Sequence, residues 1–446
     1  MIPPAIETLL KGKSMLGANR PAWKVEVENT IAGLEKTVEP DKIKSIDIRQ
    51  RIGTAGQATV VFDNDNARYS PDVTSGDYER LFWPNNILRI EQGYGTDDVR
   101  TFTGLISKVE MSRFPAEITV TCWDMYKRAL DQLVTDPGAS GDLRTHFFLN
   151  ESPESTFATM AEWAGWAPGE IHTEPTELLL DEFHIRWESY ADKWLELTEL
   201  SGWEIVVDVD GEIHFRQATD RQPEAVDEAV NPVDGTPVDL DHSPIVSDSE
   251  RVFSGTGETG TEYVKDTHYT MDYGAGTITW IGSAPATVYV SYVYAAWIFR
   301  EGEDIIQVQY TIDDDDLSWS VVVEGEDDQG DPVWETKAFG PAEYYNVLGQ
   351  AIEHVLVPES DDRDELEQVA ERVEYIMRSR PRRFTFAAIG NPWLELGDCV
   401  QVSETSTTVS EIYRIVGMTT RMDESGYTME LETYHYGYAP PPESGP

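Results

Sequence analysis

The chain has 446 residues, of which 34 are Lys or Arg and 82 are Asp or Glu, so its formal charge is −48. An apolar fraction of 40% with 13 Trp and 20 Tyr excludes an intrinsically disordered chain, because such chains lack the bulky groups that offset ordering entropy. The acid excess argues against a protein that grips duplex DNA, and the length predicts about three domains.

The acid is concentrated in the later part of the chain. Residues 1–140 hold 17 basic and 20 acidic side chains (17 − 20 = −3), whereas residues 141–446 hold 17 and 62 (17 − 62 = −45). Acid excess with few Lys, here 11 against 23 Arg, keeps proteins soluble in concentrated salt. A host with a high-salt interior is one explanation. The other is that partners enclose the near-neutral first part, while the acidic remainder faces solvent or a lumen.

Residues 20–135 predict an all-β unit. Six short segments alternate apolar and polar residues and are separated by turn signals, a pattern typical of a barrel or sandwich. The expected strands are 23–27, 43–48, 58–62, 87–90, 101–109 and 118–123.

Residues 140–217 predict a small α/β unit. Helical spacing runs over 153–164, with Ser155 as a possible N-cap, and again over 190–200. Two apolar runs follow, joined by Asp210-Gly211, which suits a tight primed turn. The sequence therefore predicts two helices and a hairpin.

Residues 218–244 are rich in Pro, Asp and Glu and predict a linker. A compact β insert is expected over 245–300, and a second β module over 301–437, with the clearest helix of the chain at 364–379. Residues 438–446 form a Pro-rich tail. The strands expected in the insert and the second module are 268–273, 277–280, 288–294, 305–310, 318–323, 384–388, 399–402, 413–419 and 427–433.

A weak repeat relates the two ends of the chain. Pro84 is followed by a strand and then by Gly104, 20 residues on (84 to 104). Pro392 is followed by a strand and then by Gly417, 25 residues on (392 to 417). The repeat predicts a related β module near each end.

Several apparent motifs fail on spacing or context. Asp208–Glu212 resembles the start of a calcium loop, but position twelve is Thr219 and the flanks are strands, so a hairpin turn is expected. Four consecutive aspartates at 313–316 alternate sides in a strand and do not converge on one cation. Gly255–Gly260 matches a dinucleotide-binding spacing, yet no helix follows it.

No catalytic, cofactor-binding or metal-binding residues are expected, so the chain is predicted not to be an enzyme. There is no G-x-S-x-G elbow, and acidic pairs for glycoside hydrolysis carry no information among 82 carboxylates. Cys122 and Cys399 lie in β runs and are expected to be buried and reduced. The eight histidines are scattered without zinc-binding spacing. They stand at positions 146, 172, 184, 214, 242, 268, 354 and 435.

The dense basic cluster Arg378, Arg380, Arg382 and Arg383 has two readings. One reading places the arginines at the C-terminus of a helix, where positive charge is favourable. The other has them form ion pairs with an acidic neighbouring subunit, and both readings stay open. No apolar run approaches the 18 residues of a membrane-spanning helix, so no membrane span is expected.

Three stretches carry a resemblance to a known family. They are Trp83–Ile90 with Phe102–Ile106 and Ile118–Cys122; Trp194–Glu204 with Asp210-Gly211-Glu212; and Asn391–Val400 with Tyr413–Val416. In this order they resemble the tail hub proteins of tailed viruses, the baseplate hub or late-control family. The resemblance implies a mainly β fold with α+β parts: two tail-tube-like β-barrel modules, a small α/β domain and a β-sandwich-like insert. The implied domains are 1–139 (arm and first barrel), 140–244 (α/β domain and linker), 245–300 (insert), 301–437 (second barrel) and 438–446 (tail).

The family resemblance also implies a function. Hub proteins are trimers, so two barrels in each of three chains form a pseudo-sixfold ring that joins the sixfold tail tube to the threefold tail tip. The implied partners are the tail tube protein, the distal tail protein, the tape measure protein and tip or fibre proteins, in a virion assembled in the host cytoplasm. DNA would pass through the ring without specific binding, and a lumen of like charge avoids trapping it.

Two alternatives stay open. One is a carbohydrate- or receptor-binding tail-tip protein that uses exposed Trp and Tyr of the insert as stacking platforms. The other is an acidic glycoside hydrolase.

Overall fold

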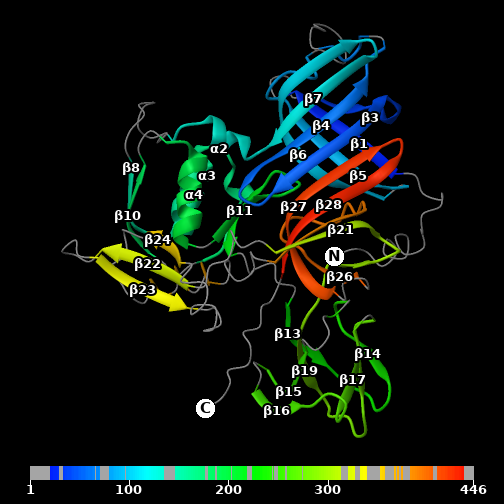
Figure 1. Cartoon of the computed structure of the whole chain (residues 1–446), viewed down its shortest axis with the longest axis vertical. Coiled ribbons are helices and arrows are strands. Elements are labelled where there is room, and N and C mark those ends of the chain that lie inside the picture. The colour runs from blue at the N-terminus through cyan, green and yellow to red at the C-terminus, as the bar shows by residue number, and fades with distance from the viewer. Residues whose placement is uncertain are drawn as a thin grey trace.

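The computed structural model is mainly β, as the sequence predicts. The described residues form four structural units, each with its own hydrophobic core. Figure 1 shows a first β module at the top, a second in the centre, an α/β unit beside them and an insert at the far end. The described residues are 21–29, 34–65, 67–70, 80–95, 97–134, 146–175, 179–185, 188–201, 203–217, 224–243, 245, 250–256, 259–273, 275–312, 320–326, 332–338, 352–356, 366, 367, 369, 370, 373, 374, 382–404 and 409–435.

The first β module is part of one sheet, with its strands in the order β2-β1-β5-β6-β7-β4-β3. All six expected strands are confirmed, and β2 is added to them. Apolar and polar residues alternate along the strands, so one face, with Val27, Val60 and Phe62, forms the core. The elements are β1 (Pro21–Asn29), β2 (Leu34–Val38), η1 (Pro40–Lys42), β3 (Ile43–Arg51), β4 (Thr54–Asp63), β5 (Ile87–Tyr94), β6 (Asp97–Arg113) and β7 (Ala116–Asp124).

The second β module repeats the strand order of the first. It runs β20-β26-β27-β28-β25-β21, against β1-β5-β6-β7-β4-β3 in the first module. One pair differs in direction, because β1 is antiparallel to β5 whereas β20 is parallel to β26. The two related modules are thus confirmed in topology. The strands are β20 (Trp297–Arg300), β21 (Ile305–Ile312), β25 (Arg382–Ile389), β26 (Cys399–Glu404), β27 (Val409–Asp423) and β28 (Gly426–His435).

The two glycines that suggested the repeat are not equivalent. Gly104 in β6 lies opposite Asp124, and Gly417 in β27 lies opposite Glu432. Counted from the two hairpins, these partners stand eight (124 − 116) and six (432 − 426) residues along their strands. The repeat therefore resides in strand order, which many side chains determine together, and not in single glycines.

The expected barrels are not closed in the described part of the chain. Closing the first module would require β3 to pair with the opposite end of its own sheet, but β3 pairs with β27 instead. Because each edge of a strand hydrogen-bonds to one neighbour at a given position, this pairing keeps the first sheet open. It also merges both modules into one 13-stranded sheet.

The α/β unit lies against both modules. Phe157, Trp194 and Phe215 fill its core, and the hairpin expected around Asp210-Gly211 is confirmed. Ser155 lies inside its helix, and Ser152 takes the N-cap position. Its elements are α2 (Lys127–Asp131), β8 (His146–Glu151), α3 (Pro153–Trp163), η3 (Pro168–Glu170), β9 (Ile171–Thr173), β10 (Leu180–Ile185), α4 (Tyr190–Ser201), β11 (Trp203–Val207) and β12 (Ile213–Gln217).

The helix expected at 364–379 packs in this α/β unit and not in the second β module. Its described residues are helical, and Leu366 and Val373 are buried in the α/β core. The strand expected at 318–323 goes with it and buries Val323 there. An apolar stripe needs an apolar surface to cover it, and the second module fills its own core. The strands of this segment are β22 (Ser320–Glu326), β23 (Pro332–Ala338) and β24 (Ile352–Leu356).

The β insert consists of two small sheets, β13-β19-β15-β16 and β14-β18-β17. Two of its strands, β13 and β14, lie in the range 218–244 that the composition predicts to be a linker. They pair with β19 and β18, because an available sheet edge outweighs weak local propensity. The strands are β13 (Glu224–Val230), β14 (Pro237–Asp239), β15 (Arg251–Gly255), β16 (Thr259–Tyr263), β17 (Tyr269–Asp272), β18 (Thr277–Trp280) and β19 (Val288–Val293).

Candidate functional site

A strand pairing between distant parts of the chain joins the two β modules. Residues 45–51 of β3 lie antiparallel to residues 417–423 of β27. The earlier half of β27 pairs with β26, and the register of β27 against β28 shifts between Ile415 and Gly417. A bulge bends and twists its strand, so the later half of β27 leaves its own module and reaches β3.

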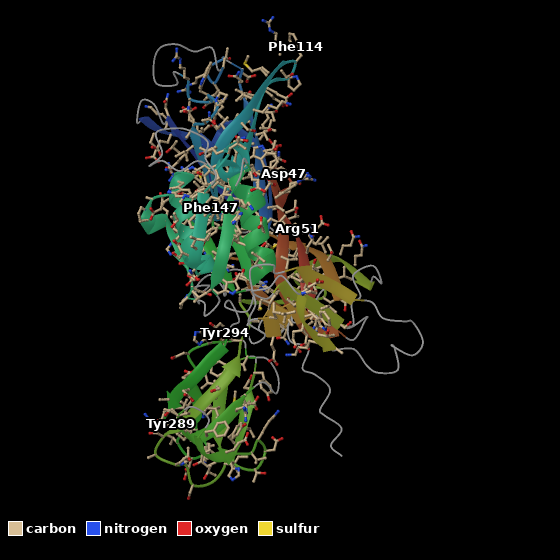
Figure 2. All side chains as sticks on the ribbon, turned by 90° about the vertical axis from the view of Figure 1, so that its left-hand side faces the viewer. Asp47, Arg51, Phe114, Phe147, Tyr289 and Tyr294 are labelled. Atoms are coloured by element: carbon tan, nitrogen blue, oxygen red, sulfur yellow. The ribbon has the colours of Figure 1, made fainter. Side chains whose placement is uncertain are left out.

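Ion pairs flank this junction on its exposed face. Arg421 Nη2 lies 3.1 Å from Asp47 Oδ2, and Arg51 Nη1 lies 3.3 Å from Glu432 Oε2. Asp47 and Arg51 are seen where the blue and red strands meet (Figure 2). The arginine side chains are more than half exposed, so each pair contributes at most about 1 kcal/mol. Backbone pairing holds the junction, and the charges favour one register.

A pair of tyrosines, Tyr427 buried and Tyr94 partly buried, forms a second contact between the modules. Tyr94 donates its hydroxyl to the Gly390 carbonyl at 2.8 Å, and Tyr427 donates to Gln92 Oε1 at 3.3 Å. A Cβ on Gly390 would lie 2.4 Å from the Tyr427 ring, so the close approach requires glycine here. Burial raises the pKa of both tyrosines, and they remain donors.

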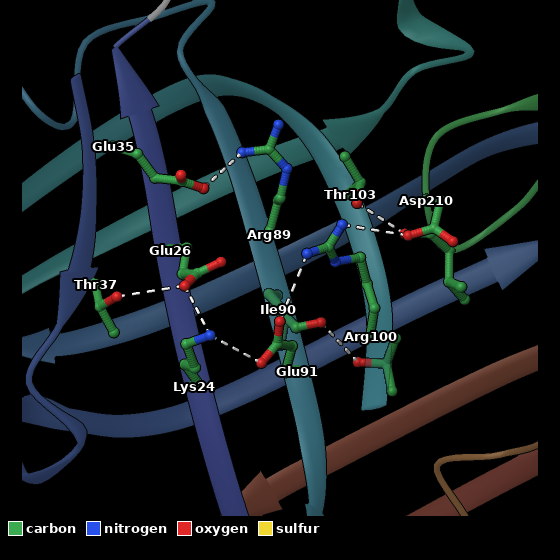
Figure 3. Close-up of polar contacts among 12 residues, drawn as sticks. Lys24, Glu26, Glu35, Thr37, Arg89, Ile90, Glu91, Arg100, Thr103 and Asp210 are labelled. Atoms are coloured by element: carbon green, nitrogen blue, oxygen red, sulfur yellow. Dashed lines mark hydrogen bonds and ion pairs between the residues drawn. The ribbon is translucent and has the colours of Figure 1, made fainter. Parts of the chain in front are cut away.

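Charged side chains on the outer face of the first module pair with one another. Lys24 Nζ lies 2.7 Å from Glu26 Oε1 and 3.1 Å from Glu91 Oε2, while Arg89 contacts Glu28 at 2.7 Å. The hydrogen bond from Lys24 lowers the pKa of Glu26. Figure 3 shows this network across β1 and β5. The face is charged but internally compensated, in keeping with the small net charge of this part of the chain.

The β11–β12 hairpin of the α/β unit docks on β6 of the first module. Thr103 donates its hydroxyl to the Val209 carbonyl at 2.7 Å, and Arg100 Nη1 lies 3.2 Å from Asp210 Oδ1 (Figure 3). Gly211 has φ +90°, a left-handed backbone that suits glycine. A Cβ at this position would also lie close to the Met125 side chain. The turn residues predicted from sequence therefore also contact another body.

A buried ionic triad joins the same unit to the second module. Glu204 Oε1 accepts from Arg216 Nε at 3.1 Å and from Arg414 Nη2 of β27. The Glu204 and Arg216 side chains are 8% and 7% exposed. Arg216 also lines a shallow crevice with Gln50 and Leu396. Charges this buried require their partners, because an unmatched ion in the interior is costly.

Asp124, at the end of β7, is a buried carboxyl. It accepts the Gly56 amide at 2.6 Å and the Tyr126 amide at 3.0 Å. Burial raises the pKa of Asp124 to about 7, although these two amide hydrogen bonds lower it. The group links β4, β7 and the start of the α/β unit.

The structure brings two of the scattered histidines together. His172 of β9 and His214 of β12 are register partners in a parallel pair, and their rings stack at 4.6 Å. His172 Nε2 lies 2.6 Å from Glu212 Oε2, and His214 Nε2 lies 3.0 Å from Asp208 Oδ2. Burial alone would raise the pKa of Asp208, but hydrogen bonds from His214 and nearby amides lower it. His172, Glu212 and His214 offer two nitrogens and an oxygen within 4.8 Å, a donor set that suits a transition metal.

The remaining residues singled out from sequence have mixed outcomes. Cys122 and Cys399 are free and buried, as expected, and burial raises the pKa of Cys399 to about 12. The glycines at 255 and 260 lie in the antiparallel strands β15 and β16. The aspartates at 313–316 lie outside the described residues, as do Arg378 and Arg380 of the arginine cluster. Arg382 and Arg383 begin β25.

Similarity to known proteins is structural. No protein-family model matches the sequence, and no curated protein matches it. The tail protein from Neisseria meningitidis MC58 has a similar structure, with a TM-score of 0.57 and 12% identity, over 93% of this chain and 97% of that chain. The 43 kDa tail protein of prophage MuSo2 from Shewanella oneidensis gives a TM-score of 0.53 at 10% identity, over 92% and 98%. The chain therefore shares the fold of these tail proteins over nearly its whole length.

Proposed function

We propose that this chain is a structural tail hub of a tailed virus. Three copies would form a ring of six β modules that joins the sixfold tail tube to the threefold tail tip and continues the DNA channel. One observation carries the proposal: two modules of identical strand order are joined side by side in a single sheet. A chain with two such modules fills two of six similar places, which is how a trimer matches a hexameric tube.

The fold shared with two tail proteins supports the same role. As a hub, the chain would contact the tail tube, distal tail, tape measure and tip or fibre proteins of the virion. Its role would be structural and not enzymatic. The acid excess fits a virus of a high-salt host, and it fits a channel that does not retain DNA. Among the described residues, no helix is both long and apolar enough to span a bilayer.

Part of the insert's set of Trp and Tyr side chains is not available to the receptor-binding alternative. Three of its large aromatic residues, Tyr269, Trp280 and Tyr292, are buried in its own core. A side chain that fills a core cannot also stack on a sugar at the surface. Tyr289 and Tyr294, seen on the insert in Figure 2, are partly exposed.

The mass of the purified full-length chain tests the proposal. Light scattering across a range of protein and salt concentrations should find a species of about three times the chain mass of 50.2 kDa. Electron-microscope class averages of that species should show a ring of six lobes. A chain that stays monomeric under all conditions, both alone and with purified tail tube protein, would contradict a hub.

A further inference from the structure

Among the described residues, two open edge segments of the joined sheet correspond to the two strand segments that pair at its centre. The shared strand order makes β21 the counterpart of β3, and β6 the counterpart of β27. Inside the chain, β3 pairs with the later half of β27. The counterparts of these two segments, β21 and the later half of β6, have no described strand on the corresponding edges.

The free edge of β6 begins where β5 stops pairing with it. β5 covers β6 from Asp97 to Leu105, and β7 covers the other edge to Arg113. A register shift against β7 lies between Ile106 and Lys108, as the shift in β27 lies just before its β3-binding half. β6 thus has the same two-part form as β27, with a bulge ahead of a half-strand whose outer edge is open.

Several side chains along both edges are exposed. Met111 of β6 is 51% exposed, Phe114 at the β6–β7 tip is 95% exposed, and Ile306 of β21 is 55% exposed. Figure 2 shows Phe114 at the end of the molecule. Long open edges with apolar side chains invite pairing with another chain, and natural proteins use such edges in assembly or cover them.

We propose that β21 of one chain pairs antiparallel with residues 107–113 of β6 in a second copy of this chain. The contact would reproduce between chains the β3–β27 junction that the structure contains within the chain. It is a heterologous, head-to-tail contact, and such contacts close into rings when the rotation permits. Three internal and three intermolecular junctions would then alternate around the ring. This inference rests on the proposed hub function and specifies how its ring is joined.

Charge favours the same orientation. The antiparallel direction of the β3–β27 pair places the start of β21 next to the β6–β7 tip. Glu303, just before β21, would then face Arg113. Opposite charges at this end of the contact favour the antiparallel orientation over a reversed one.

Cysteine cross-linking tests the pairing in the full-length chain. A disulfide forms only between residues whose Cα atoms lie about 4.4–6.8 Å apart, so it reports direct opposition. Gln309→Cys is combined in turn with Lys108→Cys, Glu110→Cys and Ser112→Cys, which bracket the register. At least one pair should give covalent dimers and trimers under oxidising conditions, and these should disappear on reduction. The natural cysteines are both buried and should not contribute.

Two controls separate this contact from chance collisions. Asp47→Cys with Arg421→Cys, opposite each other in the internal junction, should cross-link within one chain and leave its mass unchanged. Gln309→Cys with Thr428→Cys, an exposed residue of β28, should give at most a tenth of the intermolecular product. Met111→Lys with Ile306→Lys, made without cysteines, should lower the trimer yield at least tenfold while leaving the melting curve of the monomer unchanged.

The outcomes distinguish the two proposals. Trimers that form by mass but cross-link through none of the three pairs would overturn the β21–β6 contact and leave the hub function standing. A chain that forms no trimer at all would overturn the hub function and this contact with it. Trimers that cross-link at one register and not through Thr428→Cys would support both.

Discussion

The two β modules have the same strand order but are attached to the α/β unit in different ways. The first module meets it through the partly exposed pair Arg100–Asp210, a hydroxyl and a backbone hydrogen bond, and apolar contacts with its core. The second meets it through the buried triad of Glu204, Arg216 and Arg414. Solvent thus screens the charge pair at the first module, whereas it does not screen the buried triad at the second. The comparison indicates that a buried charge network distinguishes the attachment to the second module from the attachment to the first.

The largest expected effect tests the buried attachment. Glu204→Gln leaves two buried guanidinium groups without the charge they share, which should cost about 3–5 kcal/mol. Asp210→Asn at the exposed attachment should cost less than about 1 kcal/mol. Chemical denaturation of the two variants, followed by tryptophan fluorescence, measures both. Equal losses would remove the distinction between the two attachments.

The two mid-strand glycines sharpen the comparison within the modules. A Cβ on Gly104 would lie 2.3 Å from the Trp123 carbonyl oxygen, whereas a Cβ on Gly417 would lie 3.2 Å from the flexible Glu432 carboxylate. Gly104→Ala should therefore cost about 1–3 kcal/mol through overpacking, and Gly417→Ala less than about 1 kcal/mol. Melting temperatures of the two alanine variants give the test. A larger loss for Gly417→Ala would contradict the geometry.

The modules also differ in a buried acid. Asp124 lies near the end of β7, and the residue at the same distance from the hairpin in β28 is Tyr434. An unfolded Asp has a pKa of about 3.9, and burial raises the pKa of Asp124 to about 7. Between these values the unfolded chain has released the proton that the folded chain keeps. Stability should fall as pH rises from about 4 to about 7, by at most about 1.4 kcal/mol per unit from this group, and level off above.

The variant Asp124→Asn isolates this contribution from the other carboxylates. Its melting temperature should change less between pH 5 and pH 8 than that of the natural chain. Asp98→Asn, at an exposed position of β6, is the matched control and should keep the natural pH dependence. Identical pH profiles for the natural chain and Asp124→Asn would show that Asp124 titrates normally.

The smallest expected effect concerns salt. If three chains meet, their residues 141–446 each bring −45, and like charges repel across a boundary at about 0.15 M salt, where the Debye length is about 8 Å. At about 1 M it is about 3 Å, so the trimer should be favoured. The near-neutral first module should provide much of the contact between chains. Sedimentation across a salt series measures this, and a trimer equally stable in dilute buffer would refute the charge argument.

The sequence by itself determined most strands of the two β modules. Alternation in segments such as 43–48 and 118–123 is a local property, because successive side chains of a strand point to opposite faces. The hairpin at Asp210-Gly211 was equally local, since a left-handed backbone selects glycine. The fold class, the two related modules and the buried cysteines followed from such patterns.

Only the tertiary structure decided which surfaces meet. The pairing of β3 with β27, the move of helix 364–379 into the α/β core and the meeting of His172 with His214 all join segments that are distant in sequence. A strand edge presents the same N–H and C=O groups whatever its side chains are, and an apolar stripe accepts any apolar surface of fitting shape. The choice among partners therefore depends on the twist, bulges and packing of the whole assembly, and no local pattern of residues records it.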